Sequence, residues 1–578
     1  MGITDINGEK NITFVIFLIM PILKKLLAVL FSLVSLLISA QSSLPQKYEY
    51  RGVWLTTIKN LDWPTTRVLT NGDIEKQQSE LLCMLDSLAS INVNTIFLQT
   101  RLRGDLIYPS QYEPFSAVFT GNVGRSPGYD PLAFAIEECH KRGMQLHAWL
   151  VTLPLGNKMH VKSLGRKSLP SSRSSLCRMH KGDWFMEPGE PATADYLCKI
   201  VSEIVSKYEV DGIHLDYIRY PDRPSSYSDA ALYRKYGKGN SLADWRRDNI
   251  TRIVRKIYEQ VKSLKPWVRV SVAPLGKHDD LSSYSSYGWN ARNTVFQDAQ
   301  MWMREGIVDA LFPMLYFKDN DFYPFVRDWV ENSCGRHIAP GIGVYRILPE
   351  EGNWDKKEIE RQLFTSRDAG AQGSVLFRSR HLLSSADGAF DIYRKVYSNK
   401  ALVPPLEWHE NTPPVQPQNF SGRRCGDSLF LSWGGVAAKK GEPAVKYNLY
   451  VSRSYPVDTT DPRNIMATAL TDTTFVWEGS TLDTMHWAVV PVNAYGVEGA
   501  PAFWSEQGYV PGYYRNEFNL PESFTWGMRV VVRNAVGEKL YECGYSQKVG
   551  VRGLPRGIYT LEVLSRDGAV LMRYPFSR

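Results

Sequence analysis

The sequence predicts an α/β protein whose main domain is a (β/α)8 TIM barrel, followed by two small β domains. Eight short apolar runs alternate with amphipathic stretches between residues 48 and 400, and eight parallel strands close such a barrel. The runs are rich in Val, Ile and Leu, as expected for strands buried on both faces. Strand-like runs separated by turns follow a Pro-rich break at 404–414.

The predicted barrel elements follow one another in regular order. The expected strands are Tyr50–Thr57, Asn94–Arg101, Met144–Val151, Val210–Tyr217, Trp267–Leu275, Ile307–Tyr316, His337–Val344 and Ala371–Phe377. The expected helices are Asp73–Ser90, Asp130–Arg142, Ala192–Tyr208, Leu242–Leu264, Val295–Glu305 and Lys356–Ala369. A doubly wound open sheet is the competing fold, but no G-x-G-x-x-G motif follows the first run to support it.

Two connections are too long to be simple turns. They are residues 102–129 after the second run and 152–191 after the third, and the latter is rich in Ser, Lys and Arg. Long loops after barrel strands commonly build or cover the active site. We therefore expect both loops at the functional end of the barrel.

Residues 1–40 are predicted to be a secretory signal. Lys24-Lys25 precede an apolar run that ends in a small residue, Ala40, and Met20 is a plausible true start. The alternative is an uncleaved membrane anchor, which would be the protein's only membrane contact. No Cys stands at position 41, so a lipid-anchored N-terminus is not indicated. The expected location is the periplasm or the cell surface.

The region after residue 415 is expected to form two β domains. Strand-like runs at Leu429–Trp433, Lys446–Ser452, Thr474–Trp477 and Met485–Val492 suggest a β-sandwich over 415–508. This region resembles a fibronectin type III domain. Residues 509–578 contain further runs at Met528–Arg533 and Gly557–Val563, and they resemble the C-terminal sorting-type β domains of secreted bacterial proteins.

Composition narrows the class of partner. The net charge is +8 without a dense Lys/Arg tract or a nucleic-acid-binding motif, so we expect a polysaccharide and no nucleic acid, with an anionic polymer as an open possibility. The seven Cys form no C-x-x-C pair, which argues against structural zinc, and their odd number argues against a disulfide framework. We expect no cofactor, and the sequence gives no oligomeric state.

The fourth run, VDGIHLDYIRYP at 210–221, carries the clearest functional signal. Strand alternation places His214 and Asp216 on the side that faces the barrel axis. A buried carboxylate is costly unless it is paired or hydrogen-bonded, so Asp216 at the end of a strand predicts a function. The structural alternative is a pair between Asp216 and Arg219, and Asp211 is assigned to structure.

The end of the second run predicts a polar cluster. Gln99 and Arg101 share the inward parity, and Asp105 follows a Gly on the loop. An Arg near a carboxylate can hold it ionised or can orient a sugar hydroxyl. The alternative is a salt bridge that only stabilises the loop.

Further polar residues are expected at the same end of the barrel. His147 and Trp149 share one parity in the third run, Tyr316 and Asp319 follow the sixth, and Arg378 follows the eighth. Taken singly, a buried His is often a core residue and loop charges are often solvated. Their convergence on one face is what predicts a site.

This set of residues suits glycoside hydrolysis, which commonly needs two carboxyl groups flanking the scissile bond. Asp216 is the first candidate, and Asp105 or Asp319 is the second, with Asp279 and Asp280 behind them. The candidate substrate-binding residues are Gln99, Arg101, His147, Trp149, His214, Tyr316 and Arg378.

Several motifs resemble the glycosyl hydrolase-like family 10 domain over about residues 48–400. They are RGVWLTT (51–57), GDLIYPS (104–110), GYDPLAFAIEE (128–138), HAWL (147–150), DGIHLDYIRYP (211–221) and DALFPMLYF (309–317). The resemblance implies a barrel glycosidase of bacterial envelopes that acts on peptidoglycan glycan strands, especially strands without peptides. It also implies a set of cleft residues, namely Asp105, His147, Trp149, His214, Asp216, Arg219 and Tyr316.

The chain departs from the family pattern at two places. Relatives usually continue the third motif as WLNPYR, where this chain reads WLVTLPLG, and they tend to have Pro-Ala before Gly-Asp, where this chain has Leu-Arg. An Asn and an Arg expected to face the sugar are therefore missing. The substrate preference of this chain is expected to differ.

Three hypotheses about function follow. The first is a metal-free glycosidase of the envelope. The second is a metal-dependent hydrolase or deacetylase with His147, His214 and Asp216 as ligands, although no H-x-H or H-E-x-x-H motif is present. The third is a glycan-binding protein without turnover.

Overall fold

The computed structural model describes residues 45–222, 224–384, 388–409, 412–425, 427–478, 485–505, 517–520, 527–546, 548–551, 553–555 and 557–577. The predicted signal segment, residues 1–40, lies outside this range. The chain divides into two units, one with residues up to Ile136 and Leu146–Ser398, the other with Glu137–Gln145 and Asn399–Arg578. Among the described residues, no helix is long and apolar enough to cross a membrane.

The first unit is built on a parallel sheet that closes on itself. Its strands are β1 (Tyr50–Leu55), β2 (Thr95–Arg101), β3 (Gln145–Val151), β7 (Gly212–Asp216), β8 (Arg269–Val272), β9 (Ala310–Leu311), β10 (His337–Ile338), β11 (Gly341–Gly343) and β12 (Gly373–Phe377). β10 and β11 are two parts of one strand, since β10 pairs with β9 while β11 pairs with β12, which pairs with β1. The predicted (β/α)8 barrel is confirmed.

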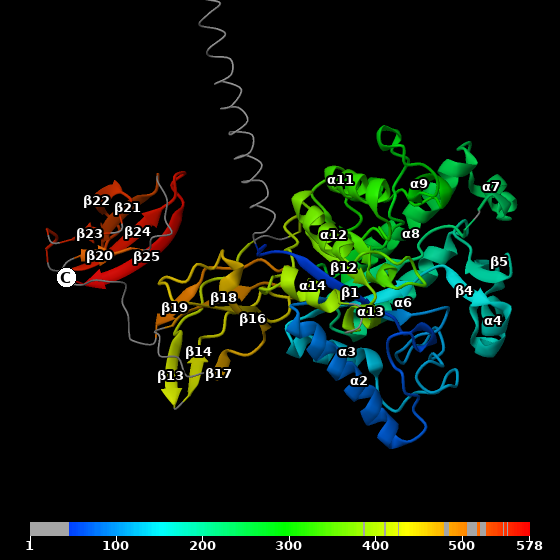
Figure 1. The fold of residues 1–578 in the computed structure, drawn as a ribbon, viewed down its shortest axis with the longest axis horizontal. Coiled ribbons are helices and arrows are strands. Elements are labelled where there is room, and N and C mark those ends of the chain that lie inside the picture. The colour runs from blue at the N-terminus through cyan, green and yellow to red at the C-terminus, as the bar shows by residue number, and fades with distance from the viewer. Residues whose placement is uncertain are drawn as a thin grey trace, which may run out of the picture. The chain divides into compact units, whose positions relative to one another are not determined.

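Helices alternate with these strands and cover the barrel (Figure 1). The main helix after each barrel strand is, in chain order, α2 (Asn71–Ser90), α3 (Pro131–Lys141), α6 (Ala192–Lys207), α8 (Leu242–Leu264), α10 (Ala299–Arg304), α11 (Tyr323–Glu331), α12 (Lys357–Asp368) and α14 (Ala389–Val396). Short elements in the loops are η1 (Ile58–Asn60), η4 (Pro224–Ser226), α7 (Ala230–Tyr236), η5 (Ser282–Tyr284), α9 (Ala291–Thr294), η6 (Asp319–Asp321), η7 (Val344–Ile347) and α13 (Ser379–Leu383).

Local sequence explains where the longest helices begin and which face they bury. α2 starts with a capping box between Thr70 and Asp73, and the Ser241 hydroxyl accepts the Asp244 N–H at the start of α8. Both devices satisfy N–H groups that have no partner inside the helix. α8 then buries an apolar stripe at helical spacing, with Ile250, Val254, Ile257 and Val261 among its members.

The long connection after β3 forms a small subdomain, which we call the insertion (residues 152–191). It contains β4 (Pro154–Asn157), α4 (Lys158–Leu164), η2 (Gly165–Lys167), α5 (Leu169–Ser172), η3 (Ser174–Leu176), β5 (Cys177–His180) and β6 (Asp183–Met186). The three strands make an antiparallel sheet in the order β4-β6-β5. The insertion starts at the carboxyl end of a barrel strand, the end where such folds carry their active sites.

The second unit contains two further groups of strands. In the first group, β13 (Ser421–Cys425), β14 (Ser428–Ser432) and β17 (Thr474–Glu478) form one sheet, and β15 (Lys446–Ser452), β16 (Ile465–Leu470), β18 (His486–Val492) and β19 (Ala502–Ser505) form another, with η8 (Pro462–Asn464) between β15 and β16. Leu431, Leu449 and Trp487 share one core. A β domain is therefore present, while its assignment to the fibronectin type III class stays a prediction.

The last group of strands, in residues 517–577, also forms two sheets. The strands β20 (Glu517–Asn519) and β23 (Lys548–Gly550) pair, and β21 (Arg529–Asn534), β22 (Lys539–Gly544), β24 (Ile558–Leu564) and β25 (Val570–Ser577) form a four-stranded sheet. Phe518, Val530 and Leu561 lie in one core. The boundaries of both β domains and the sorting-type resemblance stay predictions.

Candidate active site

Asp216 is the last residue of β7 and lies at the carboxyl end of the barrel. It is 5% exposed. Trp149 Nε1 donates to its Oδ2 over 3.0 Å, and the Tyr217 N–H donates to its Oδ1 over 2.7 Å. Burial raises the pKa of Asp216 to about 6, although the two hydrogen bonds and the charges of Arg219 and Arg103 act in the opposite direction. A carboxyl with this pKa can both donate and accept a proton near neutral pH.

Tyr217 carries the chain out of the strand in a strained conformation. Its φ is +52°, a left-handed conformation that costs a non-glycine residue about 1 kcal/mol or more. Its ring lies between two guanidinium groups, with Arg219 at 4.8 Å and Arg103 at 5.4 Å from the ring centroid. Arg219 also lies 5.7 Å from the exposed Trp289 ring. The rim of the barrel next to Asp216 is thus cationic and aromatic.

Arg219 is buried, and one of its donors makes no hydrogen bond within the described residues. Its Nη1 donates to Asp222 Oδ1 over 2.7 Å, whereas its Nε has no partner among the described residues. The sequence-based alternative, a structural pair between Arg219 and Asp216, is not what the structure shows. Arg219 instead pairs with an exposed Asp and influences Asp216 only through its charge.

Aromatic side chains form the wall beside Asp216. Tyr316 is half-buried and stacks on Phe377 with ring centroids 5.4 Å apart, and Trp54 meets both rings edge-on at 6.5 and 6.2 Å. Burial and the nearby Asp216 charge raise the pKa of Tyr316 well above its usual range. Tyr316 therefore stays protonated and can donate a hydrogen bond to a sugar oxygen.

The two histidines lie below this layer, inside the barrel. His214 Nε2 accepts from Trp54 Nε1 and its Nδ1 bonds Ser271 Oγ, both over 3.0 Å. His147 is fully buried and packs against Phe97, with ring centroids 4.9 Å apart. Burial lowers the pKa of both, for His147 to about 3. They are neutral core residues that support the site from beneath, which does not fit the predicted contact with substrate.

The side chains of Gln99 and Arg101 also bond protein groups and stabilise the fold. Gln99 Oε1 accepts the N–H groups of Thr57 and Ile58. Arg101 is fully buried, where it holds Glu113 through two hydrogen bonds of 2.8 and 2.6 Å and donates to the carbonyls of Val151 and Thr152. Because these donors are already used, substrate binding by Arg101 does not fit its geometry. The alternative of a loop salt bridge is the one observed.

Arg378 likewise faces a protein carboxylate. Its Nε lies 3.3 Å from Asp62 Oδ1, and Asp62 is itself fixed by the Thr56 N–H and hydroxyl. The side chain of Arg378 is 13% exposed. This pair ties the loop after β1 to the residue after β12, so the substrate-binding role expected for Arg378 lacks support in the geometry.

The two candidates for the second catalytic carboxylate, Asp105 and Asp319, differ in burial and in hydrogen bonding. Asp105 is 3% exposed, and its Oδ1 accepts the Arg103 N–H over 2.9 Å and lies 3.7 Å from His160 Nε2. Asp319 is exposed at the start of η6. Arg103 therefore connects the two carboxyl groups, because its backbone N–H bonds Asp105 and the charge of its side chain acts to lower the pKa of Asp216. No such connection joins Asp319 to Asp216 among the described residues.

The hypothesis of a metal site is not supported by the geometry. Both ring nitrogens of His214 are engaged by protein groups, so His147, His214 and Asp216 do not form a ligand set. Within the described ranges, no group of three or more His, Cys, Asp and Glu side chains is placed to hold a metal ion.

Some residues of the site were not among the sequence candidates. Trp54, Arg103, Tyr217 and Trp289 all line or support the region around Asp216. Strand parity could have identified Trp54, and Arg103 and Tyr217 adjoin predicted site residues. Nothing in the local sequence marks Trp289.

A closed (β/α)8 barrel with a buried carboxyl at the end of a strand, flanked by aromatic and cationic side chains, defines a barrel of the glycosidase type. The comparison with known families agrees. The chain belongs to the glycosyl hydrolase-like 10 family, whose profile matches residues 49–341.

Curated relatives carry the same designation. The chain is 30% identical to glycosyl hydrolase YngK of Bacillus subtilis over 393 residues, which covers 64% of this chain and 76% of that protein. It is 32% identical to glycosyl hydrolase DigH of Escherichia coli K12 over 377 residues, which covers 59% and 84%. Together with the family match, these similarities support a glycosidase-type function.

Two solved structures of glycosidases align with the chain at low TM-scores. The PgaB glycoside hydrolase domain from Bordetella bronchiseptica aligns with a TM-score of 0.42 at 14% identity and covers 61% of this chain and 99% of that one. An α-L-fucosidase from Paenibacillus thiaminolyticus aligns with a TM-score of 0.41 at 17% identity and covers 64% and 52%. These alignments are too loose to transfer residues.

Proposed function

We propose that this protein hydrolyses glycosidic bonds in a cell-envelope glycan, namely peptidoglycan strands that have lost their peptides. The observation that carries the proposal is Asp216, a buried carboxyl with a pKa of about 6 at the carboxyl end of a barrel strand. The family match and the curated relatives named glycosyl hydrolases support the reaction class. The predicted signal segment supports export, which an envelope substrate requires.

Asp216 serves as a proton-transfer group at the scissile bond. Its carboxyl is held by one N–H on each oxygen, so its orientation is fixed before substrate binds, and one lone pair remains on each oxygen. Such preorganisation lowers the cost of reaching the reactive geometry. A pKa near 6 supplies both protonation states at the pH of the envelope.

Asp105 is the second carboxyl group of the proposed mechanism. Glycosidases use a pair of carboxyl groups on either side of the scissile bond. Asp105 is buried and adjoins the rim that Arg103 shares with Tyr217 and Asp216. The exposed Asp319 lacks this setting and ranks behind it.

Aromatic and cationic side chains near Asp216 provide the sugar contacts. Tyr316 and Trp289 offer ring faces, and the guanidinium of Arg219 lies beside the Trp289 ring, where its charge favours a polar oxygen of the substrate. Sugar rings present C–H faces that pack on aromatic rings and hydroxyls that need directed donors. These residues hold the substrate against Asp216.

The test is a product assay on the purified protein and an Asp216→Asn variant. Each is incubated with peptide-free peptidoglycan glycans and with chitin oligosaccharides, with and without a chelator, and the products are read by mass spectrometry. Cleavage by the wild type alone, unchanged by chelator, is the expected result. Binding without cleavage of any glycan would replace the proposed reaction with a binding function, and chelator-sensitive cleavage would favour a metal-dependent hydrolase.

A further inference from the structure

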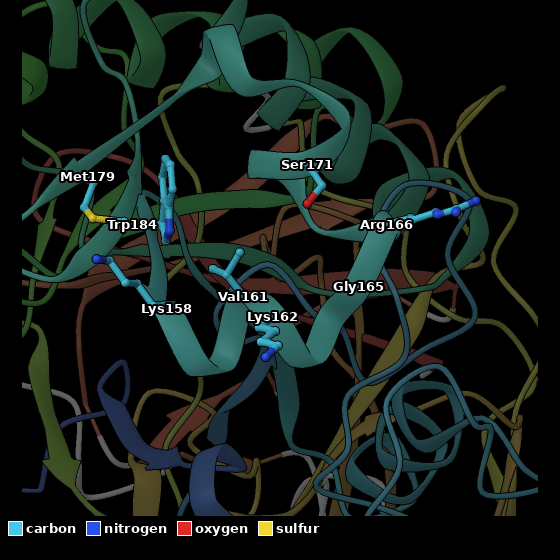
Figure 2. Close-up of a pocket in the computed structure, with 8 residues that line it drawn as sticks. All are labelled: Lys158, Val161, Lys162, Gly165, Arg166, Ser171, Met179 and Trp184. Carbon is cyan, nitrogen blue, oxygen red and sulfur yellow. The ribbon is translucent and has the colours of Figure 1, made fainter.

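The insertion contains a pocket of its own, separate from the residues around Asp216. Its volume is about 540 Å³, a size typical of ligand pockets. The residues that line it are Lys158, Val161, Lys162, Gly165, Arg166, Ser171, Met179 and Trp184. Figure 2 shows Trp184 and Met179 at one end, near Lys158, and Arg166 at the opposite end.

The pocket is lined by cations without a compensating acid. Lys158, Lys162 and Arg166 are exposed, and none of them forms an ion pair within the part of the chain that the structure describes. The insertion as a whole has seven Lys or Arg and three Asp or Glu. Charges of one sign that line a concave wall attract an oppositely charged ligand.

The remaining lining suits a sugar ring. Val161 is buried and Trp184 and Met179 are half-buried, so they give the pocket an apolar surface with one large ring. Lys158 and Lys162 lie about 6 Å apart along α4 from the rise of a helix, and Arg166 follows in the turn after it. A ligand that pairs with more than one of them must carry its charges at intervals, as a charged sugar chain does.

The helix that bears the cations is bonded to the loop that bears Asp105. His160, between Lys158 and Lys162 on α4, places its Nε2 3.0 Å from the Arg103 carbonyl oxygen and 3.7 Å from Asp105 Oδ1. At Gly104, which has φ +79°, a Cβ would lie 3.2 Å from Leu155 of the insertion. The helix that carries the lining cations is therefore bonded to the loop that carries the proposed catalytic Asp105.

We propose that this pocket is a subsite for a carboxylated stretch of the glycan chain, held in register with the cleft by α4. The inference rests on the proposed function and adds the charge of the substrate to it. Peptides are attached to peptidoglycan through the lactyl carboxyl group, so a strand without peptides exposes one carboxylate per disaccharide. Chitin has the same β-linked N-acetylglucosamine backbone without these carboxylates.

The experiment measures the binding of glycan ligands to the full chain by calorimetry. The chain carries Asp216→Asn, so that it does not cleave the ligand during the measurement. The ligands are peptide-free glycan fragments and chitin oligosaccharides of equal length. A Lys158→Gln/Lys162→Gln/Arg166→Gln variant should bind the carboxylated glycan about tenfold more weakly at low salt, with a smaller difference at high salt, since exposed charge contacts are screened. Its affinity for chitin oligosaccharides should not change.

A matched variant separates the pocket from overall charge. Lys167, Lys181 and Lys199 are exposed and do not line the pocket, so Lys167→Gln/Lys181→Gln/Lys199→Gln removes the same charge elsewhere. Equal weakening by this variant, or no weakening by the pocket variant, would overturn the subsite. The proposed function fails on a different readout, namely absence of cleavage by the wild type, so the two failures are distinguishable.

Discussion

Trp149 and Asp216 lie on neighbouring strands and are joined by a hydrogen bond of 3.0 Å from the indole Nε1 to the carboxyl Oδ2. The parallel register of β3 and β7 pairs Val151 with Asp216 and Trp149 with His214. Trp149 is therefore level with His214, two residues before Asp216, and its side chain faces inward like those of both residues. The long indole side chain reaches from there up to the Asp216 carboxyl. This contact joins a predicted substrate-binding residue to the predicted catalytic group.

The first prediction concerns this hydrogen bond. Trp149→Phe keeps the ring volume but removes the N–H that favours the ionised carboxyl. The pKa of Asp216 should therefore rise above about 6. The pH profile of kcat/KM should show its Asp216-dependent limb at higher pH. Trp54→Phe removes an N–H bond to the buried His214 instead, so it should leave that limb in place, and an equal shift in both variants would contradict the assignment.

The second prediction is that ionised Asp216 lowers the free energy of unfolding when the pH is above its folded pKa. Its folded pKa of about 6 lies above the ordinary value of 3.8. The contribution of Asp216 to stability is therefore largest below pH 3.8 and is lost as the pH rises through 6. The unfolding free energy of Asp216→Asn minus that of the wild type should rise by about 2–3 kcal/mol from pH 4 to pH 8 in urea titrations. Asp319→Asn, at an exposed site, should give a flat difference.

The third prediction ranks the second carboxyl group. Asp105→Asn should lower kcat about 10²–10⁴-fold, as expected for loss of an acid–base group, with little change in the melting temperature. Asp319→Asn should stay within about threefold of the wild type, because an exposed substitution away from the site has a small effect. The reverse ranking in a glycan-cleavage assay would move the second carboxyl group to η6.

The periodic parts of the fold were predictable from sequence. Apolar runs predicted all eight barrel strands, and α8 spans the predicted Leu242–Leu264. The sixth strand is shorter than predicted because Pro313, which has no N–H, follows it. Pro340 likewise divides the seventh strand between β10 and β11. Helix α11 was not predicted, although its nine residues include a buried apolar face of Phe325, Val326 and Trp329.

The candidate site was predictable only where strand parity determines direction. Parity identified Asp216 and Trp149, which the structure brings together. It could not show that Arg101 is already bound to Glu113, twelve residues further along a loop. The pocket of the insertion depends on tertiary folding that brings Trp184 to Val161, and no local pattern predicts such a contact.

The fourth prediction is that Arg101 holds the start of the insertion in place. Arg101→Lys keeps the charge but loses the two-pronged contact with Glu113 and the bonds to the Val151 and Thr152 carbonyls. Local opening of the insertion should become easier by about 1.4 kcal/mol or more, which gives roughly tenfold faster trypsin cleavage within residues 158–184. Arg166→Lys is the control, since this exposed residue keeps a trypsin site and makes no such bonds. Equal rates in all three proteins would show that Arg101 does not hold the insertion.

The last prediction concerns the space beneath the site. His147 and Gly212 face each other across β3 and β7, and a Cβ at position 212 would lie 2.5 Å from His147 Nδ1. The ring is fully buried and packs against Phe97. Gly212→Ala should therefore lower the free energy of unfolding by about 1–3 kcal/mol or more, as overpacking does.

Two further variants show whether this cost comes from the His147 ring. A His147→Ala/Gly212→Ala double variant should lose less stability than the sum of the two single variants, because the smaller side chain makes room for the new methyl group. Gly72→Ala is the matched control. Gly72 lies in α2, where a Cβ would meet only the Thr70 hydroxyl at 4.0 Å, so alanine there should stabilise the helix by about 0.5–1 kcal/mol. Strict additivity in urea unfolding of the double variant would mean that the cost of a side chain at position 212 does not come from the His147 ring, and that the buried histidine does not set the glycine requirement of β7.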